Sequence, residues 1–324
     1  MLIPLFFRMT ITGWFPRRIL LSHALHEGLG DYLQERRPDL EYRARGLSEI
    51  TSDDVAWSEV LVGFRAPRVP GWERHYRWIH CIGAGVDAFA FRTGLLPTTL
   101  LTRTSEDFGP QIGEYCLART LAVTQRLRIL DQEQRARHWH PKHPSQLRGT
   151  RALIVGTGAV GRGIARAFGA AGVTVEGMSR SGAPRDGFVA VHPVSEFGEV
   201  AREVDWLILA CPLTEGSYHF LNHQRLAALS GAYLINVGRG PLVDEAELPA
   251  ALQRGWLSGA ALDVFETEPL PRTSPLWEHS NVTISPHISG LTTIPGAAAG
   301  FLACLADVEA GRRPRLAVDP LQGY

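Results

Sequence analysis

Cysteine is scarce in this sequence and follows no pattern. The four cysteines stand at positions 81, 116, 211 and 304, far apart and without a Cys-x-x-Cys pair. This spacing excludes a zinc ribbon and a disulfide-stapled scaffold, and a few scattered thiols fit a reducing compartment. We therefore expect a cytoplasmic protein that holds no metal ion.

An excess of charge of either sign is missing as well. Lys and Arg together number 33, as do Asp and Glu, so no net charge draws the chain toward nucleic acid or an anionic membrane. No stretch reaches the roughly 18 uninterrupted apolar residues of a membrane span. The apolar start MLIPLFF is too short for a signal peptide and has no basic residue ahead of it. We interpret it as an N-terminal extension.

What the sequence does contain is an alternation of short apolar runs with helical patterns. Its 324 residues suffice for two domains. Each apolar run ends in a polar or glycine-containing tip, as in RILLSH (18–23), EVLVGF (59–64), VDWLILACPL (204–213), AYLINVGRG (232–240), LSGAALDVF (257–265) and VTISPH (282–287). This alternation predicts two doubly wound α/β domains, whose parallel strands bring these tips together at the carboxyl edge of each sheet, where ligands bind.

A different pattern runs from Gly113 to His138. Apolar residues recur at helical spacing, and neither Gly nor Pro follows Gly113. The pattern predicts one helix, longer than a single packing face needs. Such a helix could connect domains or carry a contact between subunits.

The segment GTGAVG (156–161) spaces three glycines as GxGxxG. It follows the strand pattern RALIV and opens the helical pattern RGIARAF, and a second strand pattern, VTVEGM, comes next. In this context the glycines allow a tight turn, close approach of a pyrophosphate and close packing of helix on strand, with the phosphate at the helix N-terminus. The segment predicts a dinucleotide site at Gly156, Gly158, Ala159, Val160 and Gly161. A purely structural glycine turn is the alternative.

The second strand of this unit ends in a basic tip. A unit that binds NAD usually has an acidic residue there, about 20 residues past the turn, to bond the ribose 2′-hydroxyl. Glu176 falls inside the strand instead, and the tip is Ser179-Arg180-Ser181. Arginine can hold a 2′-phosphate through charge-assisted hydrogen bonds, and the serines add hydroxyl donors. We predict that NADP(H) is preferred and NAD(H) possible, with a solvated loop arginine as the alternative.

Three later tips carry side chains suited to the reduction of a 2-keto acid. Arg239 in NVGRG can bind the carboxylate with its planar guanidinium. His287 in SPHISG can protonate the carbonyl oxygen, because histidine titrates near neutral pH. Glu268 in DVFETEP, if it lies beside His287, would favour the protonated ring and orient it. Taken singly, each of the three could be an ordinary surface, turn or capping residue.

The order of these segments resembles the D-isomer-specific 2-hydroxyacid dehydrogenases, and most of all their glyoxylate/hydroxypyruvate reductase branch. The resemblance covers most of residues 75–290 and is carried by GAGVD (83–87), GEYCLA (113–118), the glycine turn, CPLT (211–214), INVGRG (235–240), ALDVFETEPLP (261–271) and SPLW…VTISPH. It implies NAD(P)H-dependent reduction of a small 2-keto acid to the D-2-hydroxy acid. It also implies the roles just given for Arg239, Glu268 and His287.

The resemblance extends to other positions. It implies that Ala84, Gly85 and Val86 cradle the substrate carboxylate and that Asp263 contacts the nicotinamide carboxamide, although a structural role at a strand end is an alternative for Asp263. It places the glycine turn, the basic tip, Arg239 and His287 around the cofactor. Further residues implied there are Cys211, Pro212, Thr214, Val237, Gly238 and Gly290. Arg65 faces either substrate or solvent. Ile288 follows His287 where the family commonly has a small residue.

We therefore expect a discontinuous substrate domain, residues 1–106 completed by 290–324, with a cofactor domain of residues 107–289 inserted and a cleft at their junction. The resemblance also implies a homodimer. One alternative is a non-catalytic nucleotide-sensing regulator of the same fold, which an intact Arg–Glu–His set disfavours. Another is a formate or phosphite dehydrogenase; the formate enzymes typically have Gln at the position of Glu268.

Two groups of histidines invite a metal-site interpretation. His138, His140 and His143 are close in sequence, and His219 and His223 are four residues apart. A metal site needs converging ligands and supporting hydrogen bonds, and these segments offer no acidic or thiol partner nearby. We expect solvated or capping histidines. The Arg-rich helical pattern before His138 contains interspersed acids and predicts a solvated face rather than a nucleic-acid site.

Overall fold

The chain forms two compact units. The computed structural model describes residues 14–22, 26–104 and 108–320, so the segment MLIPLFF lies outside the described residues. Unit 1 takes in Met1–Glu106 and Thr292–Tyr324, and unit 2 takes in Asp107–Leu291. Each unit is built on one sheet, and unit 2 is inserted between the two parts of unit 1. The predicted α/β fold with two sheets is confirmed.

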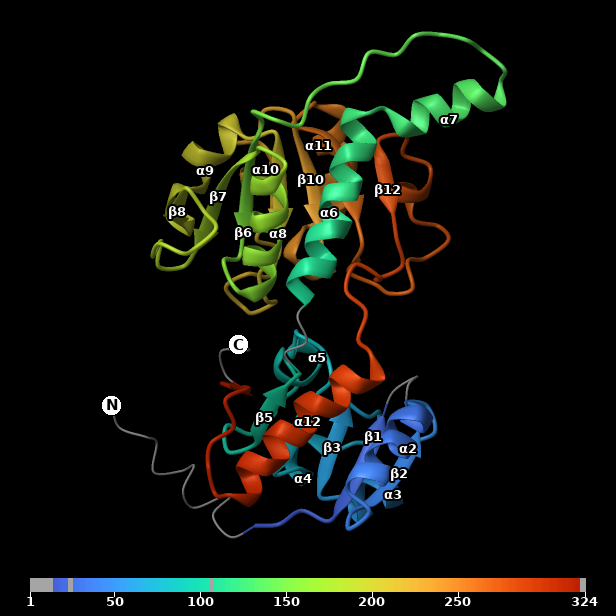
Figure 1. Cartoon of the computed structure of the whole chain (residues 1–324), viewed down its shortest axis with the longest axis vertical. Coiled ribbons are helices and arrows are strands. Elements are labelled where there is room, and N and C mark those ends of the chain that lie inside the picture. Colours follow the sequence, from blue (N-terminus) through green and yellow to red (C-terminus); the bar gives the residue numbers. More distant parts are fainter. Residues whose placement is uncertain (1–13, 23–25, 105–107, 321–324) are drawn as a thin grey trace. The chain divides into compact units, whose positions relative to one another are not determined.

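Unit 1 contains a six-stranded sheet in the order β13-β5-β4-β3-β1-β2 (Figure 1). Its strands are β1 (Arg18–Ser22), β2 (Glu41–Arg45), β3 (Val60–Gly63), β4 (Trp78–Cys81), β5 (Leu100–Arg103) and β13 (Ala317–Val318). The first five pair in parallel. The two-residue β13 pairs antiparallel with β5, which departs from the all-parallel sheet that the pattern predicted.

Helices cover both faces of the unit 1 sheet. Their bounds are α2 (His26–Arg36), α3 (Ser52–Trp57), α4 (Trp72–His75), α5 (Asp87–Ala90) and α12 (Ile294–Glu309). Ile19 and Leu21 pack with α2 and α12 in one core, while Leu20 between them packs with α3, α4 and α5 in the other. Side chains alternate along a strand, so a strand buried on both faces needs the continuous apolar run that the sequence shows.

A buried histidine lies within β4. His80 is fully buried, and its ring nitrogens lie 2.8 Å from Thr102 Oγ1 and 3.1 Å from Thr104 Oγ1. Its ring also contacts Phe301 of α12, with 5.6 Å between centroids. Burial lowers the pKa of His80 to about 3. The core of unit 1 therefore holds this imidazole in its neutral form at physiological pH.

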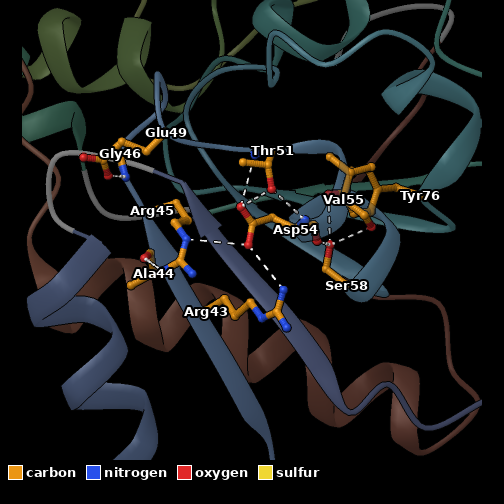
Figure 2. A network of polar contacts seen from close by, with 10 residues as sticks. All are labelled: Arg43, Ala44, Arg45, Gly46, Glu49, Thr51, Asp54, Val55, Ser58 and Tyr76. Carbon is orange, nitrogen blue, oxygen red and sulfur yellow. Dashed lines mark hydrogen bonds and ion pairs between the residues drawn. The ribbon is translucent and has the colours of Figure 1, made fainter.

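A capping box starts α3 and connects it to β2 (Figure 2). Thr51 Oγ1 accepts the backbone N–H of Asp54, and Asp54 Oδ2 accepts the backbone N–H of Thr51. Arg43 and Arg45 of β2 face Asp54 Oδ1 at 3.3 and 3.6 Å. Burial by itself would raise the pKa of Asp54, but the hydrogen bonds from Thr51 and the two arginines outweigh it and lower that pKa. The carboxylate therefore stays charged and joins strand to helix.

Unit 2 contains a seven-stranded sheet in the order β12-β11-β10-β9-β6-β7-β8, with every neighbouring pair parallel. Its strands are β6 (Arg151–Val155), β7 (Thr174–Ser179), β8 (Ala190–Pro193), β9 (Trp206–Leu209), β10 (Ala232–Asn236), β11 (Leu257–Leu262) and β12 (Val282–Ile284). Its helices are α6 (Phe108–Thr124), α7 (Leu127–Arg135), α8 (Ala159–Ala170), α9 (Phe197–Val200), α10 (His223–Leu226) and α11 (Leu248–Gln253). Figure 1 shows α6 and α8 together on one face of this sheet.

Glycines bring α6 and α8 into backbone contact. A Cβ added at Gly113 would lie 2.9 Å from the carbonyl oxygen of Gly163. A Cβ added at Gly163 would lie 2.3 Å from backbone atoms of Gly109. Only residues without a side chain permit this approach, so these glycines determine how α6 packs on the helix that begins at the glycine turn.

The prediction of one helix from Gly113 to His138 is wrong. The chain breaks between α6 and α7 at Arg126, which adopts a left-handed φ of 55°. The N–H of Ser145 donates to the carbonyl oxygen of Thr124, so a residue 21 positions further along the chain bonds to the last residue of α6. This long-range contact leaves no local signal. Among the described helices none, including the 17-residue α6, has both the length and the apolar character needed to cross a membrane.

Candidate active site

The glycine turn joins β6 to α8. Gly156 has a φ of 107°, and a Cβ at Gly161 would lie 1.9 Å from the carbonyl oxygen of Gly156, so both positions require glycine. Gly158 is the N-cap of α8, and no atom of the described residues lies within 4 Å of a Cβ placed there. The N-terminus of a 12-residue helix, with Ala159 and Val160 in its first turn, therefore adjoins open space. This arrangement fits a bound pyrophosphate.

The basic tip lies at the end of β7. Ser179 is the last residue of the strand, and Arg180 and Ser181 are exposed. Ser179 Oγ accepts the N–H of Gly182, and Ser181 Oγ accepts the N–H of Ala183, so the turn uses both oxygens as acceptors. Each hydroxyl hydrogen remains a donor. The tip thus presents a cation and two hydroxyl donors, which suits a phosphate.

His287 and Glu268 come together although 19 residues separate them. His287 Nδ1 lies 2.9 Å from Glu268 Oε2, and Glu268 Oε1 accepts the backbone N–H of Phe265 at 3.2 Å. His287 follows β12 in a left-handed conformation, φ 55°, and its side chain is 44% exposed. The glutamate therefore engages one ring nitrogen, and Nε2 is the nitrogen left to face a substrate.

Asp263 holds the loop that carries His287. Its fully buried carboxylate accepts the Ser285 hydroxyl at 2.6 Å and the N–H groups of Ile288 and Ser289 at 3.0 and 2.8 Å. The carbonyl of Asp263 also accepts the N–H of His287 at 2.8 Å. The sequence pointed to Asp263 as a contact for nicotinamide. A structural role at a strand end was the alternative, and the structure shows Asp263 ordering the histidine loop.

Arg239 follows β10 in a loop that Asn236 organises. The buried Asn236 side chain donates to the carbonyl of Arg239 and accepts the N–H of Gly238. A Cβ at the next residue, Gly240, would lie 1.8 Å from the carbonyl carbon of Phe265. The loop of Arg239 therefore packs directly against the segment that leads to Glu268. Asn236 stands in the same sequence motif as Arg239, but the sequence does not indicate that it orders this loop. Its two hydrogen bonds in the structure do.

The segment 211–214 follows β9 at the same edge of the sheet. Thr214 is held by Ser217, whose Oγ accepts the N–H of Thr214 at 2.8 Å and donates to the carbonyl of Pro212 at 2.7 Å. Burial raises the pKa of the Cys211 thiol to about 12, so that thiol remains protonated. The other residues predicted to line the cofactor site are buried or half-buried in unit 2: Val237, Gly238 and Gly290.

The predicted carboxylate cradle belongs to unit 1. Ala84, Gly85 and Val86 form the loop between β4 and α5. Arg103 donates to the carbonyl of Ala84 at 2.8 Å, and Cys81 Sγ donates to the carbonyl of Gly85 at 3.1 Å. Arg65 is exposed just beyond β3. Unit 1 thus contains the loop Ala84–Val86, while unit 2 contains Arg239, Glu268, His287 and the predicted cofactor residues.

The histidines do have acidic partners, so the sequence-based expectation was wrong on this point. His140 Nδ1 lies 3.1 Å from Glu133, which also pairs with Lys142 at 3.5 Å. His219 lies between two carboxylates, with Nε2 3.0 Å from Glu266 and Nδ1 3.6 Å from Asp244. A metal ion binds an imidazole through one nitrogen, whereas here a carboxylate lies at each ring nitrogen of His219.

A family model matches residues 117–289, more than half of the chain, and describes the NAD binding domain of the D-isomer specific 2-hydroxyacid dehydrogenases. The chain belongs to this family. It is therefore a dehydrogenase of the 2-hydroxyacid class, an oxidoreductase with a nicotinamide-cofactor domain. The predicted family is confirmed.

Curated relatives place this dehydrogenase in the glyoxylate/hydroxypyruvate reductase A branch. The protein of that name from Serratia proteamaculans is 36% identical over 76% of this chain and 81% of its own length. Its counterpart from Yersinia enterocolitica is 33% identical over the same shares. A D-isomer specific 2-hydroxyacid dehydrogenase from Xanthobacter autotrophicus, solved with NADPH and MES, is 30% identical, with a TM-score of 0.84 over 95% of this chain and 100% of that one.

Proposed function

We propose that this dehydrogenase reduces a small 2-keto acid of the glyoxylate or hydroxypyruvate type to the D-2-hydroxy acid, with NADPH as preferred reductant. The single observation that carries the proposal is the 2.9 Å contact between His287 Nδ1 and Glu268 Oε2. It fixes a histidine ring with one nitrogen free for a carbonyl oxygen. The curated relatives named as glyoxylate/hydroxypyruvate reductases support the choice of substrate class.

Each residue has a distinct task in this proposal. His287 donates a proton from Nε2 to the substrate carbonyl oxygen, and Glu268 holds the ring in the orientation that this transfer needs. Arg239 binds the substrate carboxylate through paired hydrogen bonds, together with the backbone N–H groups of Gly85 and Val86. A nicotinamide cofactor, when bound, would supply the hydride.

The residues around the glycine turn suit a nicotinamide dinucleotide. The open space at Gly158 and the first turn of α8 provide the phosphate site. Arg180 and its flanking serines then hold a 2′-phosphate. The solved relative with bound NADPH supports this cofactor preference. In this chain the basic tip at the end of β7 would account for it.

We further propose that the protein is a homodimer and that α6 and α7 form its interface. Exposed apolar side chains gather in this segment of unit 2: Leu121, Val123, Leu127, Ile129, Leu130 and Trp139, the last 96% exposed. Apolar surface of this extent between Leu121 and Trp139 marks a contact with another protein. Light scattering coupled to size exclusion should give about twice the chain mass of 35.6 kDa. A monomer would contradict the proposed interface.

The activity is tested by following cofactor oxidation with a panel of 2-keto acids, formate and phosphite. We expect turnover with glyoxylate or hydroxypyruvate, faster with NADPH than with NADH, and a D-configured product from hydroxypyruvate. Formate or phosphite oxidation in place of keto-acid reduction would identify a different dehydrogenase. Cofactor binding without turnover of any of these substrates would identify a nucleotide-sensing regulator.

A further inference from the structure

Two backbone N–H groups of unit 1, those of Gly85 and Val86, hold the substrate carboxylate in the proposed function. In the described part of the chain, no protein acceptor bonds to either group. Donors that are oriented before the anion arrives bind it more tightly, because little ordering remains to be done on binding. The side chains that bond to this loop are therefore the residues to consider for orienting it.

The carbonyl groups of the loop are anchored one after the other. Arg103 Nη1 donates to the oxygen of Ala84 at 2.8 Å, and Cys81 Sγ donates to the oxygen of Gly85 at 3.1 Å. In a trans peptide the C=O of one residue and the N–H of the next point in opposite directions. The bond to the carbonyl of Ala84 therefore fixes the direction of the N–H of Gly85. The bond to the carbonyl of Gly85 fixes the direction of the N–H of Val86. Both N–H groups point away from the anchoring side chains.

The sheet places the two anchors side by side. Cys81 is the last residue of β4, Arg103 is the last residue of β5, and they are register partners. Register partners in neighbouring parallel strands direct their side chains to the same face. Two residues earlier, Ile79 and Leu101 line the same apolar core on that face. The strand register thus puts both donors beneath the loop.

The charge of Arg103 adds to its geometric role. Burial lowers the pKa of Arg103, and its ordinary value is high enough that the guanidinium remains charged near neutral pH. A partly buried cation beneath the loop attracts an anion bound above it, because solvent screens such a charge less than one at the surface. The same guanidinium therefore orients one donor and favours a negatively charged ligand.

We propose that Arg103 and Cys81 are positioning residues that orient the backbone N–H groups of Gly85 and Val86 toward the substrate carboxylate. They act through the loop and do not touch the substrate. The inference rests on the proposed function, because it takes a 2-keto acid as the ligand of this loop. It adds two side chains that determine carboxylate affinity.

The test compares the KM for glyoxylate with kcat in Arg103→Met and Cys81→Ala. Losing an anchor weakens binding of substrate and transition state alike, so KM should rise while kcat changes little. We expect about a tenfold rise in KM for Arg103→Met, because the lost bond involves a charged donor, and about threefold for Cys81→Ala, because a thiol is a weak donor. The inhibition constant of oxalate, which carries carboxylates but no reducible ketone, should rise in step.

Three controls separate positioning from general damage. Cys81→Ser retains a donor and should restore a KM near wild type. Arg74→Met removes an exposed arginine of α4 in the same unit and should leave KM unchanged. The KM for NADPH and the thermal midpoint should stay near wild type in every variant. If Arg103→Met does not fold, Arg103→Lys is the substitute variant. It keeps the charge but not the planar guanidinium, and it should raise the KM for glyoxylate by a smaller factor.

The outcomes distinguish this inference from the proposed function. Wild type that reduces no 2-keto acid would contradict the proposed function itself. Active wild type, with an unchanged glyoxylate KM in both Arg103→Met and Cys81→Ala, would overturn the inference alone. A loss confined to kcat would likewise contradict a role in carboxylate affinity. A fall in thermal midpoint with no change in KM, and no rescue by Cys81→Ser, would show that the two side chains only stabilise the fold.

Discussion

The guanidinium of Arg151 lies 3.1 Å from the carboxylate of Glu176, across the neighbouring strands β6 and β7 of unit 2. Glu176 is the third residue of β7, and Ser179 ends that strand. At roughly 3.3 Å per residue, the carboxylate is anchored about 10 Å short of the strand tip. The acid that an NAD-binding unit places at this tip is therefore absent, and Arg180 takes its position.

Cofactor preference should follow from that replacement. If Arg180 and its serine neighbours hold a 2′-phosphate, NADPH should be favoured over NADH by about 2–3 kcal/mol, or roughly 30- to 150-fold in kcat/KM, after allowing for solvent screening of an exposed charge. Arg180→Ala should remove most of this preference by weakening NADPH alone. Steady-state kinetics with both cofactors measures it.

The same preference should shrink as salt rises, since exposed charge pairs are screened. Arg185→Ala, which removes another exposed arginine of the same loop, serves as the matched control. Equal efficiency with NADPH and NADH in wild type would contradict the assignment and leave Arg180 as a solvated residue.

Replacing His287 with Ala should abolish most turnover. Proton donation by a positioned side chain contributes about 10²–10⁴-fold, so kcat should fall within that range while the dissociation constant of NADPH changes little. Single-turnover kinetics and cofactor titration measure the two quantities. A His287→Ala enzyme that kept more than about a tenth of the wild-type rate would rule out His287 as the proton donor.

Arg239→Lys should raise the KM for the keto acid strongly. An ammonium group is a point charge and cannot reproduce the paired bonds of a guanidinium to a carboxylate. The measurement is KM for glyoxylate, with KM for NADPH as the internal control. If neither KM nor kcat changed, the carboxylate would be held elsewhere, and Arg65 would be the next residue to replace.

The stability of the protein should fall in acid because of His80. Its folded-state pKa of about 3 lies below the ordinary value of 6.5, so the unfolded chain binds a proton that the folded chain excludes. The contribution of the neutral imidazole is therefore fully present above pH 6.5 and is lost as the pH falls toward 3, at about 1.4 kcal/mol per pH unit in that window.

Denaturant unfolding between pH 7 and 4 tests this expectation. His80→Gln keeps an uncharged hydrogen-bonding side chain between Thr102 and Thr104. Its free energy of unfolding should fall less with decreasing pH than that of wild type, by up to about 3 kcal/mol at pH 4. His143→Gln, at an exposed histidine, is the control. Identical slopes for wild type and His80→Gln would mean that the folded core admits the protonated ring.

Local patterns predicted much of unit 2 correctly. The apolar run RALIV became β6, Arg151–Val155, and Gly156 and Gly161 of the turn occupy positions where a side chain would clash. Such features depend on neighbours in sequence. The break at Arg126 depends on Ser145 instead, and the sequence pattern therefore missed it.

The sequence by itself determined the two-sheet α/β fold and which residue types stand at the strand tips, because periodicity and glycine spacing are local properties. The order of its motifs indicated the family. Only the tertiary structure decided which tips meet. It placed Glu268 next to one nitrogen of His287, and it placed N–H groups of the histidine loop where they donate to the Asp263 carboxylate. It also placed Cys81 beside Arg103. These contacts join residues up to 26 positions apart, and strand register and loop packing establish them.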